Sequence, residues 1–587
     1  MNPLLLLLGC LGVFLGLVFG LGLPLVAGWR LAPAEKICAG AAAGVVLLYL
    51  FALVDYWLQL PAPAGGLLPL AAAGLLAARR RACAHLLRAP DARRLLGAWL
   101  LVAGWCLGLL ALVRCYSGGG WALDWADHYT RALFFLQHQP AHSSLYGGDQ
   151  LPTRPPLVNA VTAVFLRLTG GAFPCFQIFT TLLSSLAFLP VWLWAGRFSR
   201  RAPRAQALVT VLFLLNPSAM ENATFAWTKL PTVFFVLTGL YFSLPAFAEG
   251  RRRQLAAACA CLAAGLLAHY SAGPCVVAIV AAYFWRRRER WLRASFWRDT
   301  ALCALPAALL LATWFGWSLR EFGVTGTFLD NTSVTETTVH SWPGFVHEKS
   351  LNLVNTLVPH FLRPGRYGFI AQSSRLGRLR DYFFQLYQVN LPWMFGSLGG
   401  LTLLWLLGRA WRRAGTAGPP PGRGFWLWLA ACTIVLGTAA YGGIDQWGVG
   451  HLCLQSLVGL GLAWLAAHLD DLPRLGRRLF AIGLAVDAVL GIGLQFFLEN
   501  LPFPDSARWH SGAEIPASYS IGWRVNLWAK LEHRYEFVGD WPLSRPLLLA
   551  LLAGLFALAV ARLWREYAIP EPTAADPSHP SSATPLA

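Results

Sequence analysis

The chain has 587 residues, of which 56% are hydrophobic and only 13% charged, and its formal net charge is +19. Many apolar runs approach the roughly 20 residues that a helix needs to cross a bilayer, which excludes an ordinary soluble globule and indicates an all-α polytopic membrane protein. The basic residues form short clusters between these runs, as the positive-inside rule describes, so the charge reports topology and predicts no nucleic-acid partner.

The first apolar run, residues 3–28, has no basic region in front of it and no small-residue cleavage site, so we interpret it as a retained span. Its glycines Gly12, Gly16 and Gly20 follow a spacing that predicts close approach of another helix. With the arginine clusters in the cytoplasm, about fifteen spans are expected, the N-terminus outside and the C-terminus inside. The expected spans are 3–28, 37–60, 65–78, 95–113, 172–196, 206–219, 230–247, 255–268, 273–285, 300–318, 391–408, 424–441, 451–467, 479–497 and 546–563.

The chain divides at changes in composition, and acidic residues gather in the loops that face away from the arginine clusters. We therefore expect reactive groups on the outer face of a plasma (inner) membrane. The expected regions are 1–94, N-terminal spans with a basic cytoplasmic loop; 95–318, a membrane core with a first outer loop at 114–171; 319–390, a large outer loop; 391–567, further spans with an outer loop at 498–545; and 568–587, a Pro/Ser/Ala-rich tail predicted to be disordered.

The first outer loop contains an unusual polar group in "WALDWADHYTRALFFL". If this stretch is helical, Asp127 lies one turn below Arg131 and Asp124 one turn below His128. Asp127 then has an ordinary explanation as half of an ion pair, whereas Asp124 shares only an imidazole. A solvated amphipathic helix is the competing interpretation, but the surrounding tryptophans and the position at membrane level favour a site.

Three weaker signals follow along the chain. Arg154 precedes Pro155-Pro156, which predicts a rigid elbow at the membrane surface. Lys229 closes a short re-entrant segment that begins at Asn216, and His269 with Tyr270 occupies a tight outer turn. Taken singly, each has a plain alternative, since a histidine at a helix end is often a cap and a lysine there often snorkels.

Together, the acid of the first outer loop, the "RPPL" elbow and the "NP…TK" segment resemble the membrane-embedded glycosyltransferases of the C-type superfamily. That group includes protein O-mannosyltransferases and the aminoarabinose transferase of lipid A. The resemblance covers roughly Leu95 to Ser318. It implies a C-type helical bundle with juxtamembrane helices, a sugar donor carried on a polyprenyl phosphate, and an acceptor that is a glycan, a lipid or a protein.

Such a transfer needs a carboxylate that accepts the proton of the acceptor hydroxyl and cations that hold the departing phosphate. A single displacement would invert the anomeric carbon. Asp124 is the preferred base and Asp127 the second candidate, with His128 beside them. The resemblance leaves a divalent metal, Mg²⁺ or Mn²⁺, open. The candidates for binding the donor phosphate are Arg154, Lys229, His269 and Tyr270, with Arg363 and Arg366 from the large outer loop; the two arginines are as easily explained by anionic membrane lipids.

The rival hypothesis is a transporter or a lipid or polysaccharide flippase. Asp55 and Asp487 lie within predicted spans, where ionisable residues often mark a transport path. Against it, the sequence shows no internal repeat, and its polar groups gather on one face rather than at mid-membrane.

Overall fold

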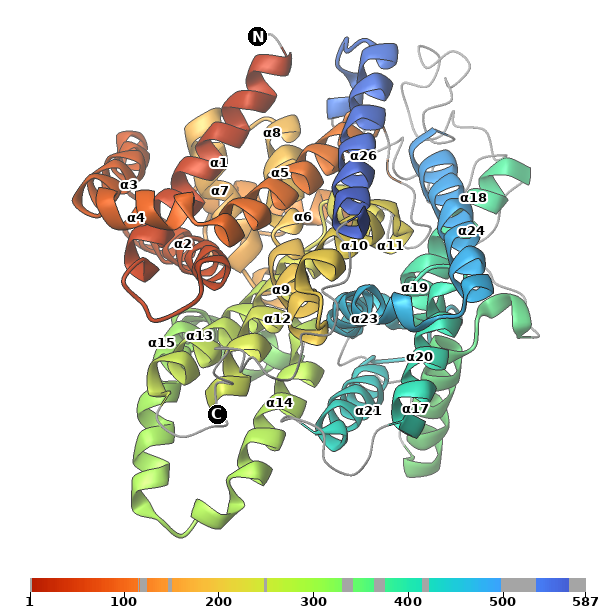
Figure 1. Ribbon diagram of the computed structural model, residues 1–587. Coiled ribbons are helices and arrows are strands. Elements are labelled where there is room, and N and C mark those ends of the chain that lie inside the picture. Colours follow the sequence, from red (N-terminus) through yellow and green to blue (C-terminus); the bar gives the residue numbers. More distant parts are fainter. Residues whose placement is uncertain are drawn as a thin grey trace, which may run out of the picture.

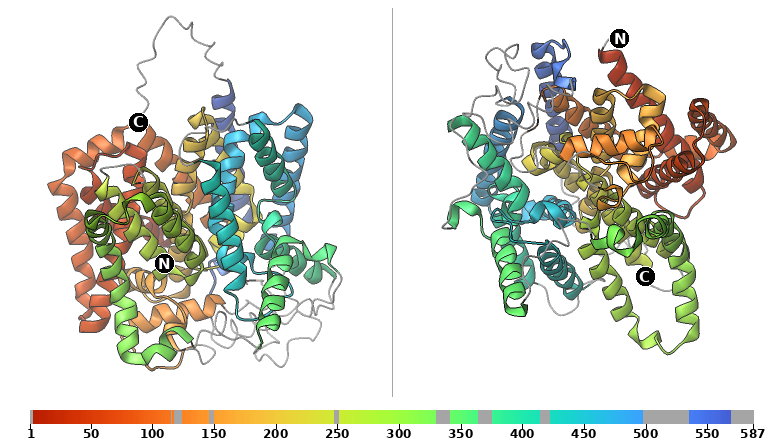
Figure 2. Two further views of the ribbon diagram at one scale, coloured as in Figure 1. Left: turned by 90° about the horizontal axis from the view of Figure 1, so that it is seen from below. Right: turned by 180° about the vertical axis from the view of Figure 1, so that it is seen from behind.

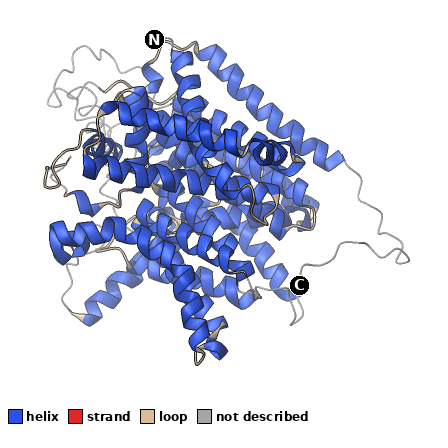
Figure 3. Ribbon diagram, turned by 90° about the vertical axis from the view of Figure 1, so that its left-hand side faces the viewer, coloured by secondary structure: helices blue, strands red, loops and turns tan. Residues whose placement is uncertain are grey.

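A computed structural model describes residues 3–114, 116, 124–145, 150–246, 251–329, 341–363, 375–413, 422–497 and 535–568. Every regular element among these residues is helical (Figure 3), which confirms the all-α prediction. Each of the fifteen predicted apolar segments contains a helix. Within the described ranges, seven helices are long and apolar enough to cross a membrane, or up to nine if each of two bent pairs is one span. The predicted disordered tail, apart from Ala568, lies outside the described residues.

The N-terminal helices form one side of the molecule, at the left of Figure 1. α1 and α2 approach so closely that a Cβ on Gly22 would collide with the carbonyl of Gly40, and one on Gly44 with the carbonyl of Val18. Of the three glycines predicted to allow close approach, only Gly20 does so, since its Cβ would lie 3.2 Å from Ala72, whereas one at Gly12 or Gly16 would meet open space. The helices are α1 (Pro3–Val26), α2 (Pro33–Leu58), α3 (Leu67–Ala78), α4 (Arg80–Arg88) and α5 (Pro90–Leu110).

Most helices of the next group run through the middle of the molecule, while α14 and α15 extend from it toward the bottom of Figure 1; the group contains most of the buried side chains. α8 and α9 form a span whose apolar window is entirely buried. The pair α11 and α12 bends by 113°, as a re-entrant segment does. The helices are α6 (Asp124–Leu136), α7 (Leu157–Thr169), α8 (Phe173–Ser185), α9 (Phe188–Phe198), α10 (Ala202–Leu215), α11 (Pro217–Thr224), α12 (Lys229–Ala246), α13 (Arg252–Ala268), α14 (Gly273–Arg286) and α15 (Ala294–Val324).

The C-terminal helices form the opposite side, and both views of Figure 2 keep them apart from the N-terminal group. α26 packs on α5 and α10, while α23 packs on α9 and α10, and α21 packs on α14. The helices are α17 (Trp342–Leu357), α18 (Arg375–Val389), α19 (Leu391–Met394), α20 (Gly399–Arg413), α21 (Arg423–Ala439), α22 (Gly450–Cys453), α23 (Gln455–His468), α24 (Arg474–Leu490), continued by a π-helix (Gly491–Phe497), and α26 (Arg545–Ala568).

The two ends of the bundle differ in charge. At one end, Arg204 of α10 stacks on Tyr567 of α26 at 3.3 Å and pairs at 3.2 Å with Asp470, which follows α23. These contacts join the three helices at their basic ends. α5 begins near this arginine-rich end and, at 1.5 Å per residue, rises about 31 Å. Beyond its last turn, the carbonyl of Val113 accepts a hydrogen bond from Gly539. We call this second end, where α6 also begins, the α6 end.

Candidate active site

Helix α6 carries the predicted carboxylates, and it begins at Asp124. Both acids lie in its first turn, where the helix dipole favours negative charge. The other face is apolar and buried, and the Trp125 ring packs against Phe173 and Phe537 with centroids 5.0 Å and 5.4 Å apart. α6 is therefore a packed element and not the solvated surface helix that was the competing interpretation.

Asp127 and Arg131 form the predicted ion pair, but inside the protein rather than on its surface. The Arg131 Nε atom donates to both carboxylate oxygens at 2.8 Å and 2.9 Å, and the arginine side chain is 1% exposed. The same guanidinium donates to the carbonyl of Leu151 at 2.8 Å and to the Thr153 hydroxyl at 2.7 Å. Arg131 thus fastens the segment before the proline elbow onto α6.

Asp124 is more accessible, with 23% of its side chain exposed. One carboxylate oxygen accepts a hydrogen bond from the indole N–H of Trp227 at 3.0 Å, and the other accepts one from Arg154 at 3.4 Å. The prediction that Asp124 shares only the imidazole of His128 was wrong, because both of these partners come from distant parts of the chain.

Arg154 stands between the two acids. Its Nη2 atom lies 3.4 Å from Asp124, and its Nε atom lies 3.7 Å from Asp127. The elbow of Pro155 and Pro156 then leads directly into α7, which packs against α6. The predicted elbow therefore brings a cation to the acids, although its guanidinium is shared between them.

His128 is buried beside these charges. Burial, and next the positive charge of Arg154, lower its pKa to about 3, while Asp124 opposes this shift. The imidazole is therefore neutral near pH 7. The neutral imidazole therefore adds a polar group, and no further positive charge, to the site.

The re-entrant segment from Asn216 to Lys229 supplies further residues of the site. Asn216 caps α11 by accepting from the backbone N–H of Ala219 at 2.9 Å, and the chain turns sharply at Ala226, whose φ is 62°. This turn places Trp227 against Asp124 and starts α12 at Lys229.

Lys229 and His269 meet as predicted, with Nζ and Nε2 separated by 3.0 Å. The other ring nitrogen of His269 accepts from the backbone N–H of Ser271 at 3.0 Å. Burial, followed by the charge of Lys229, holds the pKa of His269 well below its usual value. The neighbouring Tyr270 hydroxyl donates to the carbonyl of Pro152 at 3.0 Å and so ties this turn to the elbow.

Sequence reasoning missed two aromatic residues of the site, Trp227 and His451. Their ring centroids lie 6.3 Å apart, and the charges of Lys229 and Arg154 help burial to lower the pKa of His451 well below its usual value. Trp227 lies two residues before the predicted residue Lys229, and this position in the sequence could have identified it. His451 sits in a short helix of the C-terminal half, and the sequence gives no signal for it.

Part of this chain is similar to a known family. Residues 153–317 match the model of the dolichyl-phosphate-mannose-protein mannosyltransferase family. The matched residues include Arg154, Lys229 and His269 and begin after α6.

Two solved structures of ArnT from Cupriavidus metallidurans are similar to this chain. The structure bound to undecaprenyl phosphate has 16% sequence identity and a TM-score of 0.44, and the similarity covers 80% of this chain and 75% of that one. The apo structure has 18% identity and a TM-score of 0.44, with coverage of 80% and 74%. No curated protein matches the sequence.

Only one of the two arginines predicted from the large loop lies among the described residues. Arg363 belongs to a separate cluster, in which it donates to the Asn355 side chain and to the carbonyls of Gln446 at 2.8 Å and Trp447 at 3.1 Å. These bonds join α17 to the loop before α22. The prediction for Arg366 lies outside the described residues.

The intramembrane acids that suggested a transporter have partners within the protein. Asp55 forms an ion pair with Arg167 and lies 3.4 Å from His138. Asp487 accepts from the Tyr387 hydroxyl at 2.6 Å and from the backbone N–H of Ser397 at 2.8 Å. Both acids therefore join helices rather than mark a transport path.

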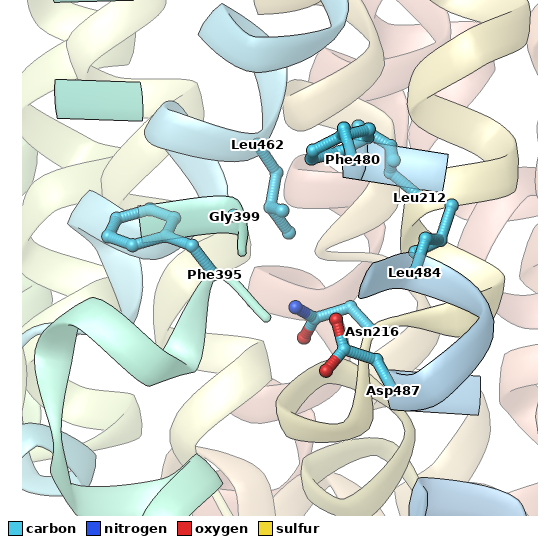
Figure 4. A pocket seen from close by; sticks show the side chains of 8 residues that line it. All are labelled: Leu212, Asn216, Phe395, Gly399, Leu462, Phe480, Leu484 and Asp487. Atoms are coloured by element: carbon cyan, nitrogen blue, oxygen red, sulfur yellow. The ribbon is translucent and has the colours of Figure 1, made fainter. Parts of the chain in front are cut away.

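The cavity beside Asp487 is also too small for a substrate. In Figure 4 its carboxylate and the Asn216 amide lie among apolar side chains, and the cavity measures about 10 Å³. Such a space is about that of one water molecule.

The two acids of the site are already occupied by protein donors, which does not fit a divalent metal there. The carboxylate of Asp127 is occupied by Arg131, and that of Asp124 by Trp227 and Arg154. Among the described residues, there is no group of three or more His, Cys, Asp or Glu side chains that could hold a metal ion.

Proposed function

We propose that this protein transfers a sugar from a polyprenyl-phosphate carrier to an acceptor on the outer face of the plasma membrane, with inversion at the anomeric carbon. The observation that carries the proposal is that Asp124 of α6 accepts hydrogen bonds from Arg154 and Trp227. Trp227 lies two residues before Lys229, which contacts His269. The family model matched by residues 153–317 describes enzymes named for a dolichyl-phosphate-mannose donor, which supports a polyprenyl-phosphate donor here.

Asp124 is the better base of the two acids. A general base must be ionised and must reach the proton that it removes. The side chain of Asp127 is only 9% exposed, and Arg131 donates to both its oxygens, whereas Asp124 is 23% exposed. The indole N–H of Trp227 holds the Asp124 carboxylate in place.

In the proposed step, the acceptor hydroxyl attacks the anomeric carbon while its proton passes to a carboxylate oxygen of Asp124. A new bond forms between the acceptor oxygen and this carbon, and the bond from the carbon to the phosphate oxygen breaks. The bonding electrons leave with the polyprenyl phosphate. Positive charge that develops on the sugar ring, as in glycoside hydrolysis, lies near an anionic carboxylate.

The departing phosphate requires fixed positive charge, which is effective where water is excluded. Arg154 and Lys229 are the proposed sources. The hydrogen-bond partner of Lys229 in the His269 ring is neutral near pH 7, because burial and the lysine charge lower the pKa of that imidazole.

The proposed roles of Lys229 and His269 in binding the donor phosphate can be tested by measuring the KM for the donor. In Lys229→Met and in His269→Ala, the KM for the polyprenyl-phosphate sugar should rise by about tenfold or more, as expected for losing a hydrogen bond to a charged group. Release of polyprenyl phosphate from a labelled donor, with an envelope extract as acceptor, measures this effect. Lys36→Met is the matched control, since Lys36 donates to the carbonyl of Ala27; unchanged donor KM in both site variants would remove them from the phosphate site.

Trp227→Phe should lower kcat by about tenfold, because the ring remains while the charged-group hydrogen bond to Asp124 is lost. Trp194→Phe is the matched control. The Trp194 indole is equally buried but donates to the carbonyl of Leu237, at 3.2 Å. Equal rates for the two variants in the same donor assay would show that the Trp227 contact does not position the base.

The orientation can be tested by labelling. In intact cells, a membrane-impermeant maleimide should react with His142→Cys, near the α6 end, and not with Arg288→Cys, which follows α14 at a basic turn. Permeabilised cells should label both positions, and the parent protein gives the background of its own cysteines. Labelling of only the second position in intact cells would place Asp124 in the cytoplasm and exclude the proposed reaction.

A further inference from the structure

A second cavity opens at the α6 end, away from the residues assigned to transfer. It has a volume of about 180 Å³, whereas a single water molecule needs roughly 10–15 Å³. It lies where the end of α5, the end of the π-helix and the start of α26 converge. Its lining residues are Ala111, Leu112, Arg114, Phe496, Phe497, Gly539, Trp541, Leu543, Arg545, Leu548 and Leu549.

The cavity lies at a membrane boundary. The three helices that meet there are all candidate spans, and each begins or ends at the cavity. Phe497 is 42% exposed and Leu549 is 41% exposed, so one wall continues onto the outer surface of the bundle. In a bilayer this surface faces hydrocarbon chains, and such a wall accommodates an acyl or prenyl chain.

Two positive charges stand at the polar end of this wall. The Nε atom of Arg114 donates to the carbonyl of Gly539 at 3.1 Å, which fixes the guanidinium at the cavity. Arg545 is exposed and opens α26, whose N-terminal dipole adds to the attraction for an anion. The nearby acid, Asp540, caps its own turn by accepting from the backbone N–H of Phe537 at 3.0 Å.

We propose that this cavity binds the phosphate head group of a membrane lipid, with the phosphate between Arg114 and Arg545 and a chain along Phe497 and Leu549. The combination of paired arginines, an apolar wall and a membrane boundary is complementary to an amphiphile with one anionic end. The cavity is separate from the transfer site, because Phe537 is fully buried and packs on the face of α6 that carries Trp125. The proposal therefore goes beyond the proposed transfer and does not depend on it.

The site can be tested by photo-crosslinking in nanodiscs that contain equal amounts of phosphatidylglycerol and phosphatidylcholine with matched chains. A photoreactive amino acid at Leu549 should give adducts enriched about fivefold in phosphatidylglycerol for each arginine engaged. The same group at Leu558, which is 58% exposed lower on α26, is the matched control and should report the bulk ratio. Equal adduct ratios at the two positions would overturn the proposal.

The arginines are tested in the same experiment. Arg545→Gln should bring the adducts at Leu549 toward the bulk ratio while the melting temperature stays unchanged, because Arg545 is exposed. Arg114→Lys keeps the charge and should retain the enrichment. Enrichment that persists in Arg545→Gln would exclude the proposed phosphate position.

The source of the phosphate is resolved by a third set of nanodiscs that also contain a small fraction of polyprenyl phosphate. If the adducts at Leu549 become polyprenyl phosphate, the cavity holds the carrier lipid. If they remain phosphatidylglycerol, it holds a phospholipid of the leaflet. Both results support a lipid-phosphate site, and a lack of preference for either anionic lipid contradicts it.

Discussion

Asp124→Asn should lower the rate of sugar transfer by about 10²-fold or more. The amide keeps the size of the side chain and can still accept from the Trp227 indole, but it cannot take the proton of the acceptor hydroxyl. The melting temperature of the purified protein should stay near that of the parent, because the side chain is partly exposed and Arg154 keeps its second acid, Asp127, 3.7 Å away. The comparison is made with labelled donor and envelope extract, and in cells by mass spectrometry of envelope glycoconjugates.

Asp127→Asn is the matched variant for this experiment. It carries the same chemical change three residues away, in a side chain that is almost fully buried and held by Arg131. We expect it to act on stability, and on rate only as far as the helix shifts. If Asp127→Asn abolishes transfer with an unchanged melting temperature while Asp124→Asn stays active, the roles of the two acids are reversed.

Arg131→Met should produce the largest loss of stability. Removing one partner of a buried ion pair leaves a buried charge without compensation, which costs about 3–5 kcal/mol. Here the guanidinium also donates to Leu151 and Thr153, so the segment before the elbow loses its attachment to α6. Thermal unfolding in detergent, followed by circular dichroism, measures the loss.

Arg320→Met provides the control, because Arg320 is an exposed arginine of α15. Its effect should stay within about 0.5 kcal/mol, as for most surface substitutions. Similar melting temperatures for the two variants would mean that Arg131 is not a structural residue, and the Asp127–Arg131 pair would have to be considered part of the chemistry.

Local sequence patterns predicted the parts of the site that lie within one helix or turn. The spacing of Asp127 and Arg131 predicted their ion pair because residues four apart share a face of a helix. The apolar runs predicted the helices because a segment that crosses a membrane must satisfy its backbone hydrogen bonds internally. Lys229 and His269 were grouped because both were expected at one level of the membrane, and the structure joins them.

Contacts between distant segments were beyond these patterns. Trp227 is 103 residues from Asp124, and only the bend between α11 and α12 brings its indole to the carboxylate. The role of Asp55 was equally hidden, because its partner Arg167 lies in α7, 112 residues away. A single sequence shows that a charge is inside a span, and the partner that neutralises it depends on how the helices pack.

The link made by Arg131 has a consequence for the timing of catalysis. Asp124 and Asp127 share one helix, Arg131 ties that helix to Thr153, and Thr153 adjoins Arg154, which returns to the acids. The links form a closed ring, so the proposed base and the proposed phosphate-binding cation move as one rigid body. The two groups are therefore already in position when the donor binds. The entropy cost of bringing them together arises when the chain folds rather than in each turnover.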